Sequence, residues 1–205
     1  LIRDVQGLQL VQGTRETEVI SKIRYNAKGQ KTLLKLGNGT ITEYTFDQDT
    51  FRLVRLITTR PPKTNRVSDT VQDLAYTYDP VGNITEITDN AYEPVFFKNQ
   101  RVRPRSRYTY DALYRLIEAE GRENCAGSDA PSHQEGSPHE TDFPIQPIHP
   151  GDPKALRNYR ERYLYDEVGN FTQMRHITQG GRWTRTYDPD TRSNRLRGIN
   201  TDKPL

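Results

Sequence analysis

A short phrase recurs along this chain and limits its fold more than any other feature. The clearest copy reads Tyr-Thr-Tyr-Asp-Pro-Val-Gly-Asn-Ile-Thr-Glu-Ile and runs from Tyr76 to Ile87. A close copy begins at Tyr163, and a third copy, which lacks the glycine, begins at Tyr108. A recurring short unit is typical of repeat architectures, in which one unit alone cannot bury enough surface to fold. Weaker copies begin at Ile23, Tyr44 and Thr186.

Each copy predicts a strand, a tight turn and a returning strand. The aromatic and β-branched residues before the turn suit a pleated, half-buried surface. In the clearest copy, the Asp79 carboxylate can accept backbone N–H bonds, Pro80 presets φ, and Gly82 can adopt the left-handed conformation without steric cost. This combination favours a type I turn followed by a glycine bulge, with hairpin tips at 79–83 and 166–170. The predicted structural turn residues are Asp79, Gly82, Asn83, Asp111, Asp166, Gly169 and Asn170.

The imperfect copies vary this pattern. Asn26 and Gly29 fill the slots of the aspartate and the glycine. Tyr114 stands where the third copy should have glycine, and a left-handed non-glycine residue costs roughly 1 kcal/mol, so we expect a different turn there. The Asp47 and Asp188 copies are expected to have longer loops without glycine. Successive turn aspartates from Asp47 to Asp188 are 32, 32, 55 and 22 residues apart, which favours a wound sheet with loops at its rim over a strict solenoid.

The repeated Tyr-x-Tyr-Asp-x-x-Gly-Asn phrase resembles the YD repeat of the Rhs family. Two longer phrases, from Tyr110 to Glu123 and from Arg160 to Asn170, are similar more particularly to the B and C components of bacterial insecticidal toxin complexes. The segment from Ser193 to Leu196 extends the second of these phrases. The resemblance runs from about residue 20 to about residue 200.

The resemblance implies an all-β fold, in which YD-repeat hairpins form part of a spirally wound sheet and thus a fragment of a hollow shell. Such a shell encloses a toxic C-terminal polypeptide until delivery. The implied partners are the rest of the same shell, the enclosed toxin segment and other toxin-complex subunits, and the implied location is secreted or extracellular.

The same repeats build a similar shell in the teneurins, so an extracellular adhesion or carbohydrate-binding module is the alternative function. Neither role needs catalysis by the repeats, and an enzyme with an unrecognised site is the weakest of the three hypotheses. A downstream Asp-Pro-x-Gly core in the full gene would favour the container, whereas a transmembrane segment with growth-factor-like repeats would favour adhesion.

The chain divides by composition into two repeat-bearing segments, 1–120 and 154–205, which we expect to continue one shell. Between them, residues 121–153 carry six prolines, four glycines and three of the four histidines, and lack valine and leucine. This composition predicts a long loop or a disordered insert. The chain begins with leucine rather than methionine, which indicates an excised fragment or an incomplete gene.

Apolar content is low for a filled globular core. Valine, isoleucine, leucine and phenylalanine together number 43, whereas there are 22 threonines and 12 tyrosines. Threonine and tyrosine favour strands, so we predict a thin wall that is wetted on both faces. The sequence contains no run of about 18 apolar residues, so we predict no membrane span.

Residues with metal-binding chemistry match no known ligand pattern. Cys125 and three histidines could in principle bind a metal, but their spacing fits no structural zinc site. Each aspartate turn offers one carboxylate, whereas a calcium loop needs several oxygen ligands in one short segment. We therefore predict no metal, no cofactor and no catalytic residue. The three histidines are His133, His139 and His149.

Four arginines alternate at Arg101, Arg103, Arg105 and Arg107, so in an extended segment they could project to one face. This row is the best candidate for an anionic partner or nucleic acid. However, the 27 acidic residues nearly balance the 30 lysines and arginines, and no nucleic-acid motif appears. We therefore expect no nucleic-acid partner, and a solvated or inward-facing strand with local salt bridges.

Overall fold

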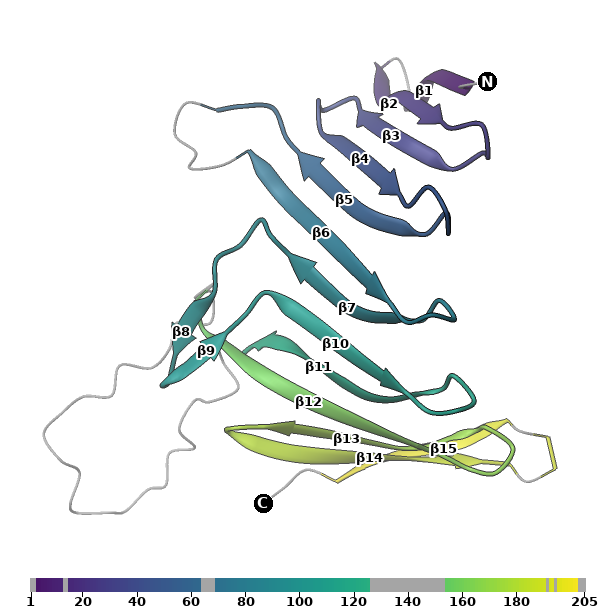
Figure 1. Ribbon diagram of the computed structural model, residues 1–205, viewed down its shortest axis with the longest axis vertical. Helices are drawn as coiled ribbons and strands as arrows, with labels where there is room; N and C mark the ends of the chain where they lie inside the picture. The colour runs from purple at the N-terminus through teal and green to yellow at the C-terminus, as the bar shows by residue number, and fades with distance from the viewer. Residues whose placement is uncertain are drawn as a thin grey trace, which may run out of the picture. The chain divides into compact units, whose positions relative to one another are not determined.

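The computed structural model describes residues 3–12, 15–63, 69–125, 154–190, 192–193 and 195–202. Every regular element within these ranges is a β-strand, so the predicted all-β fold is confirmed (Figure 1). The chain forms two compact units, residues 1–93 and residues 94–205.

Unit 1 is an antiparallel meander, in which each strand pairs with the next one along the chain. Such neighbour-to-neighbour pairing follows from short connections, because a tight turn returns the chain directly beside the strand that it has just left. Its strands are β1 (Arg3–Gln12), β2 (Arg15–Tyr25), β3 (Lys31–Leu36), β4 (Ile41–Phe46), β5 (Leu53–Thr59), β6 (Thr70–Tyr78) and β7 (Ile84–Asp89).

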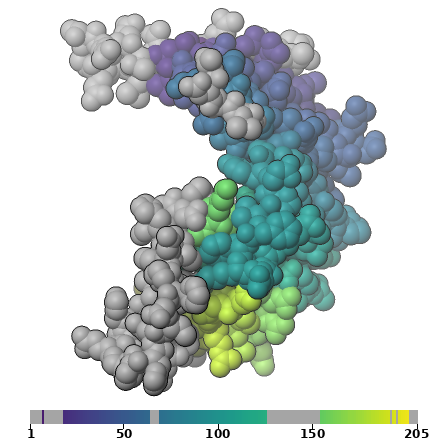
Figure 2. Space-filling model, turned by 90° about the vertical axis from the view of Figure 1, so that its left-hand side faces the viewer, coloured from purple at the N-terminus to yellow at the C-terminus, as the bar shows by residue number. Residues whose placement is uncertain are grey.

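Unit 2 combines a small hairpin with a second antiparallel meander. The hairpin consists of β8 (Val95–Phe97) and β9 (Gln100–Val102). The hairpin contacts β12, and Figure 2 views the molecule from the side on which the hairpin lies in Figure 1. The meander consists of β10 (Arg105–Tyr110), β11 (Leu116–Asn124), β12 (Leu156–Tyr165), β13 (Phe171–Thr178), β14 (Gly181–Pro189) and β15 (Leu196–Asp202).

Strand β11 continues four residues beyond the boundary that composition suggested at residue 120. It pairs with β12 as far as Asn124 and Leu156, and the Cys125 N–H then donates to the Ala155 carbonyl at 2.9 Å. Backbone pairing holds this end of the strand without valine or leucine, which is why composition placed it in the insert. The rest of the predicted insert, residues 126–153, lies outside the described residues.

The described residues contain very little fully buried apolar surface. The buried apolar side chains are those of Val102, Ala119, Cys125 and Ala155, and all four belong to unit 2. Most other strand residues are half-buried or alternate with exposed ones. A single sheet that meets water on both faces has this pattern, so backbone pairing and cross-strand contacts carry much of the stability.

The two faces of the unit 2 sheet differ in chemistry. Along β12, exposed residues alternate with half-buried ones, so Arg160 and Arg162 lie on one face and Tyr159 on the other. On the half-buried face, the rings of Tyr159, His176 and Trp183 form a stack across β12, β13 and β14, with centroids 5.3 Å and 4.9 Å apart. Cross-strand aromatic contacts of this kind stabilise sheets.

Candidate functional site

The clearest copy of the repeat forms a five-residue turn around the Asp79 carboxylate. The Asp79 N–H donates to the Asn83 carbonyl at 2.9 Å, which closes the hairpin. One carboxylate oxygen accepts the N–H groups of Gly82 and Asn83 at 2.7 Å and 2.8 Å. The other oxygen accepts the Asn83 side-chain amide at 2.8 Å. Gly82 has a φ of 115°, so the positive φ predicted for it is confirmed.

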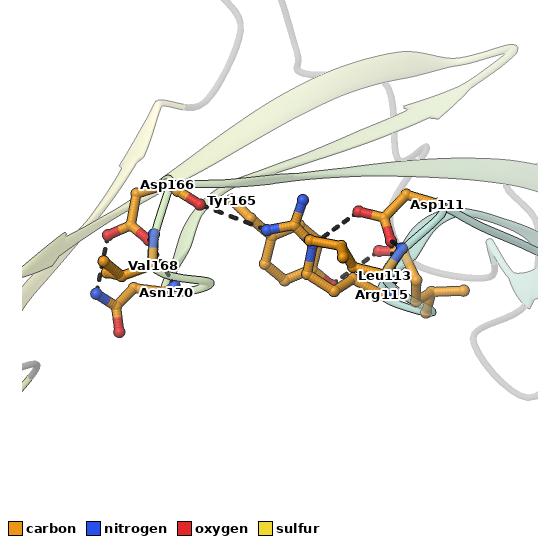
Figure 3. A network of polar contacts seen from close by, with 8 residues as sticks. Asp111, Leu113, Arg115, Tyr165, Asp166, Val168 and Asn170 are labelled. Atoms are coloured by element: carbon orange, nitrogen blue, oxygen red, sulfur yellow. Dashed lines mark hydrogen bonds and ion pairs between the residues drawn. The ribbon is translucent and has the colours of Figure 1, made fainter.

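The copy at Asp166 has the same geometry (Figure 3). The Asp166 N–H donates to the Asn170 carbonyl at 2.9 Å, and the carboxylate accepts from the N–H groups of Val168 and Asn170. The Asn170 side-chain amide donates to the second carboxylate oxygen at 2.8 Å. Gly169 has a φ of 92°, which matches the prediction for this position as well.

The third copy keeps this turn, contrary to the expectation that Tyr114 would change it. Asp111 and Arg115 close the hairpin with an N–H to carbonyl bond of 2.9 Å, and Tyr114 adopts a φ of 62°. The carboxylate accepts the N–H groups of Leu113 and Arg115 at 2.8 Å and 2.9 Å. These bonds to the aspartate hold the tyrosine in the left-handed region despite its strain.

The weaker copies keep the carboxylate or amide at the first turn position but vary in length. Asn26 closes a five-residue turn with Gln30, and Asp47 closes a six-residue turn with Arg52. The expectation that Asp188 begins a turn is wrong, because β14 extends through Pro189 and the turn residue is Asp190. Pairing of Pro189 with Leu196 adds one more rung to this hairpin, which moves the turn two residues along the chain.

An arginine and a tyrosine link neighbouring aspartate turns in unit 2 (Figure 3). The side chain of Arg115, the last residue of the Asp111 turn, donates to the backbone carbonyl of Asp166 at 3.4 Å. In return, the Tyr165 hydroxyl donates to the Leu116 carbonyl at 2.8 Å. The guanidinium carbon lies 4.9 Å from the centre of the Tyr165 ring, a favourable cation–π distance. We call this pair of contacts the Arg–Tyr link.

The same link occurs in unit 1, between the Asp47 and Asp79 turns. Arg52 donates to the carbonyls of Asp79 and Pro80 at 2.9 Å and 3.1 Å. The Tyr78 hydroxyl donates to the Leu53 carbonyl at 2.7 Å. The link was not predicted from sequence, although both copies carry a signal: arginine ends the turn where the Asn26, Asp79 and Asp166 copies have glutamine or asparagine.

Hydrogen bonding sets the charge state of the turn aspartates. At Asp79 and Asp166, desolvation raises the pKa, but the bonds from the asparagine side chain and the backbone N–H groups outweigh it and lower the pKa overall. At Asp111, the backbone N–H of Arg115 is the largest cause of a lowered pKa. The three turns therefore hold their carboxylates in the ionised form, which accepts all of these bonds.

Within the described ranges, the residues with metal-binding chemistry form no cluster that could hold a metal ion. The Cys125 thiol is buried. The three histidines that could in principle bind a metal together with Cys125 lie outside the described residues. Among the described side chains, no three histidine, cysteine, aspartate or glutamate residues gather as metal ligands. The described part of the chain also contains no helix long and apolar enough to cross a membrane.

Comparison with curated proteins identifies two bacterial toxin subunits as relatives. YenC2 of Yersinia entomophaga is 38% identical over 191 residues, which make up 90% of this chain and 18% of that subunit. YenC1 of the same organism is 39% identical over 168 residues, or 82% of this chain and 16% of the subunit. The chain thus spans less than a fifth of either relative. No protein-family model matches the chain.

Solved structures of toxin complexes contain the same fold. The crystal structure of TcdB2-TccC3-Cdc42 matches 95% of this chain and 9% of its own, with a TM-score of 0.68 and 36% identity. The Tc holotoxin pore of Photorhabdus luminescens, with a mutated TccC3, matches 93% of this chain and 8% of its own, with a TM-score of 0.68 and 38% identity.

The chain is homologous to these toxin subunits and shares the fold of the solved toxin complexes, consistent with the Rhs/YD-repeat family that its sequence resembles. Its relatives within that family are subunits of bacterial toxin complexes, so the resemblance drawn from the sequence is confirmed.

Proposed function

We propose that this chain is part of the wall of a YD-repeat shell, which encloses a toxic polypeptide and helps to deliver it. The Arg–Tyr link is the observation that carries the proposal. It recurs in both units, and in each it joins the tip of one hairpin to the tip of a neighbouring hairpin. A thin sheet buries few apolar side chains. Contacts between neighbouring hairpin tips therefore suit a continuous wall, because they hold adjacent hairpins together.

The proposed role needs no reactive group in these residues. Exclusion and confinement depend on paired backbones and cross-strand contacts, which the two meanders supply. The partners of the wall would be the remaining repeats of the same shell, the enclosed polypeptide and other subunits of a toxin complex. As with a secreted toxin, the assembled shell would act outside the cell that makes it. The similarity to YenC2 and YenC1 supports this assignment.

Protease protection tests the proposal directly. The protein that contains this chain would be treated with a nonspecific protease, and the survival of its C-terminal polypeptide would be followed by mass spectrometry. We expect this polypeptide to survive in the intact protein and to be digested once the shell is opened with denaturant. The double variant R52A/R115A, which removes the arginine from both links, should lower the denaturant concentration at which protection is lost.

Two outcomes would contradict the shell. One is digestion of the C-terminal polypeptide in the intact protein at the same rate as in the denatured protein. The other is specific binding of a sugar or a cell-surface receptor by a protein that protects nothing, which would favour the adhesion module.

A further inference from the structure

A cavity of about 520 Å³ lies in unit 2, between the β8–β9 hairpin and the exposed face of the meander. The side of the molecule with this hairpin faces the viewer in Figure 2. Six arginines line the cavity, whereas Glu120 is the one acidic residue among its lining residues. The arginines are Arg101, Arg103, Arg105, Arg107, Arg160 and Arg162.

Two parts of the chain bring these arginines together. Arg101 belongs to β9, which is held against β12 by a bond of 3.2 Å from the Asn158 amide to the Arg101 carbonyl. The chain then turns at Arg103, whose carbonyl accepts the Arg105 N–H at 2.8 Å, and enters β10. The alternating arginines therefore do not form one extended strand, as the sequence suggested, but still line one cavity.

The acidic residues near the cavity already show which chemistry the arginines accept. Glu118 binds Arg162 at 3.0 Å, and Glu120 binds Arg160 through both Nε and Nη2. These are charge-assisted bonds between a planar guanidinium and a carboxylate. The lining residues include six arginines and one glutamate, so their summed charge is positive, and most of these arginines are exposed.

The spacing of the arginines matches an extended peptide. Arg160 and Arg162 alternate along β12, as Arg105 and Arg107 do along β10, so each pair projects to one face with a spacing of about 7 Å. Alternate side chains of an extended peptide have the same spacing. Tyr159 is the aromatic residue of the lining, and its ring stacks on His176 instead. The aromatic ring among the lining residues is thus already stacked on another ring, whereas single-stranded nucleic acids are bound through aromatic side chains on which their bases stack.

We propose that this arginine cavity binds an acidic peptide segment in extended conformation, with carboxylates at alternate positions. The site goes beyond the wall function, because it gives this part of the chain a recognition surface of its own, and it stands whether or not the shell encloses a toxin.

Fluorescence anisotropy with labelled decapeptides tests the site on the protein that contains this chain. The probes are a peptide of five alternating Glu-Thr pairs, a peptide of the same composition with its glutamates in adjacent pairs, and a ten-nucleotide thymidine strand. The double variant R101Q/R103Q, which we call the groove variant, removes two positive charges from the arginine cavity. Its control, R192Q/R195Q, removes two exposed positive charges outside the cavity lining.

We expect the alternating peptide to bind most tightly. The groove variant should weaken its binding about tenfold, since each lost arginine removes one charge-assisted contact, whereas the control should stay within about twofold of wild type. Equal binding of the two peptides, or equal loss in the two variants, would reduce the effect to general charge attraction and overturn the proposal. Tighter binding of the thymidine strand, lost in the groove variant, would overturn it in favour of nucleic acid.

Discussion

Asp79, Asp111 and Asp166 each use both carboxylate oxygens to organise a turn, so one residue fixes the local shape of each hairpin tip. The residue at the following bulge position must then accept a positive φ, whether it is glycine or tyrosine. The first of these requirements is visible in sequence, because aspartate and glycine have specific roles in turns. The positive φ of Tyr114 could not be predicted from sequence, because hydrogen bonds between neighbouring residues of the turn impose it.

Replacing the bulge glycines with valine should destabilise the hairpins. We expect G82V and G169V each to lower the free energy of unfolding by roughly 1–2 kcal/mol, because a β-branched residue is strained at these φ values. Space around Gly169 is open, whereas a side chain at Gly82 would meet the Arg52 guanidinium at 3.0 Å, so G82V should cost more. Denaturant titration measures both, with G198V in open space as the control. Equal stability of all three variants would exclude the strain argument.

Replacing Tyr114 with glycine should have the opposite effect. Its side chain is 59% exposed, so little packing is lost, while relief of the left-handed strain is worth up to about 1 kcal/mol. The neighbouring Leu113 is 70% exposed and lacks a positive φ, so L113G should instead destabilise by about 0.5–1 kcal/mol through chain entropy. Thermal unfolding of the two variants should therefore shift in opposite directions. Destabilisation by Y114G would show that the tyrosine makes contacts that outweigh its strain.

Acidification should weaken the turns. The folded-state pKa values of Asp79 and Asp166 are lowered, so their contribution is present above the ordinary value of about 3.9 and is lost as pH falls through the folded value. The variant D79N/D166N keeps an oxygen acceptor, as Asn26 does, but cannot be protonated. Between pH 6 and pH 3, its unfolding midpoint in urea should fall less than that of wild type. An E167Q control should behave as wild type, and identical pH profiles for all three proteins would contradict this prediction.

At the scale of the element, the hairpins follow from sequence and the links between them do not. Strand, aspartate and glycine within a dozen residues predict a hairpin, since all of its contacts are local. The Arg–Tyr link joins residues 25 to 51 positions apart, which no local pattern encodes. The last turn begins at Asp190 and not, as predicted, at Asp188, for a related reason. Strand length is set by pairing with the next strand and not by the Tyr-Asp phrase.

Removal of the tyrosine hydroxyl isolates one half of the link. We expect Y78F and Y165F each to cost about 0.5–1.5 kcal/mol, because each leaves a backbone carbonyl without its hydroxyl donor. The matched control is Y187F, since the Tyr187 hydroxyl lies 3.9 Å from the Met174 sulfur, a weak acceptor. Equilibrium unfolding in urea distinguishes them. A cost for Y187F as large as for the other two would show that the hydroxyl bonds do not secure the turns.

At the scale of the whole molecule, low apolar content and high threonine and tyrosine content did predict a thin sheet, and buried apolar side chains are indeed few among the described residues. The arginine cavity could be anticipated only in part. Alternation suggested one face, but the reversal of the chain at Arg103 and the contribution of Arg160 and Arg162 depend on tertiary pairing.

The segment between β11 and β12 should be dispensable for the sheet. Replacing residues 126–153 with Asn-Gly should leave stability unchanged or raise it, because each doubling of loop length costs about 0.6 kcal/mol and both strand ends already pair. A longer deletion of residues 121–153 removes the end of β11 and should destabilise the protein. Thermal unfolding compares the two, and equal damage from both deletions would contradict the proposed boundary at the end of β11.

An electron cryo-microscopy reconstruction of the protein that contains this chain would show directly whether the repeats form a shell around a polypeptide. We expect the aspartate turns to lie along the edge of a continuous wall, with the Arg–Tyr links between neighbouring hairpin tips and density for a polypeptide inside the enclosed space. An open sheet with nothing enclosed, or a wall in which Arg52 and Arg115 do not contact the neighbouring turns, would contradict this expectation.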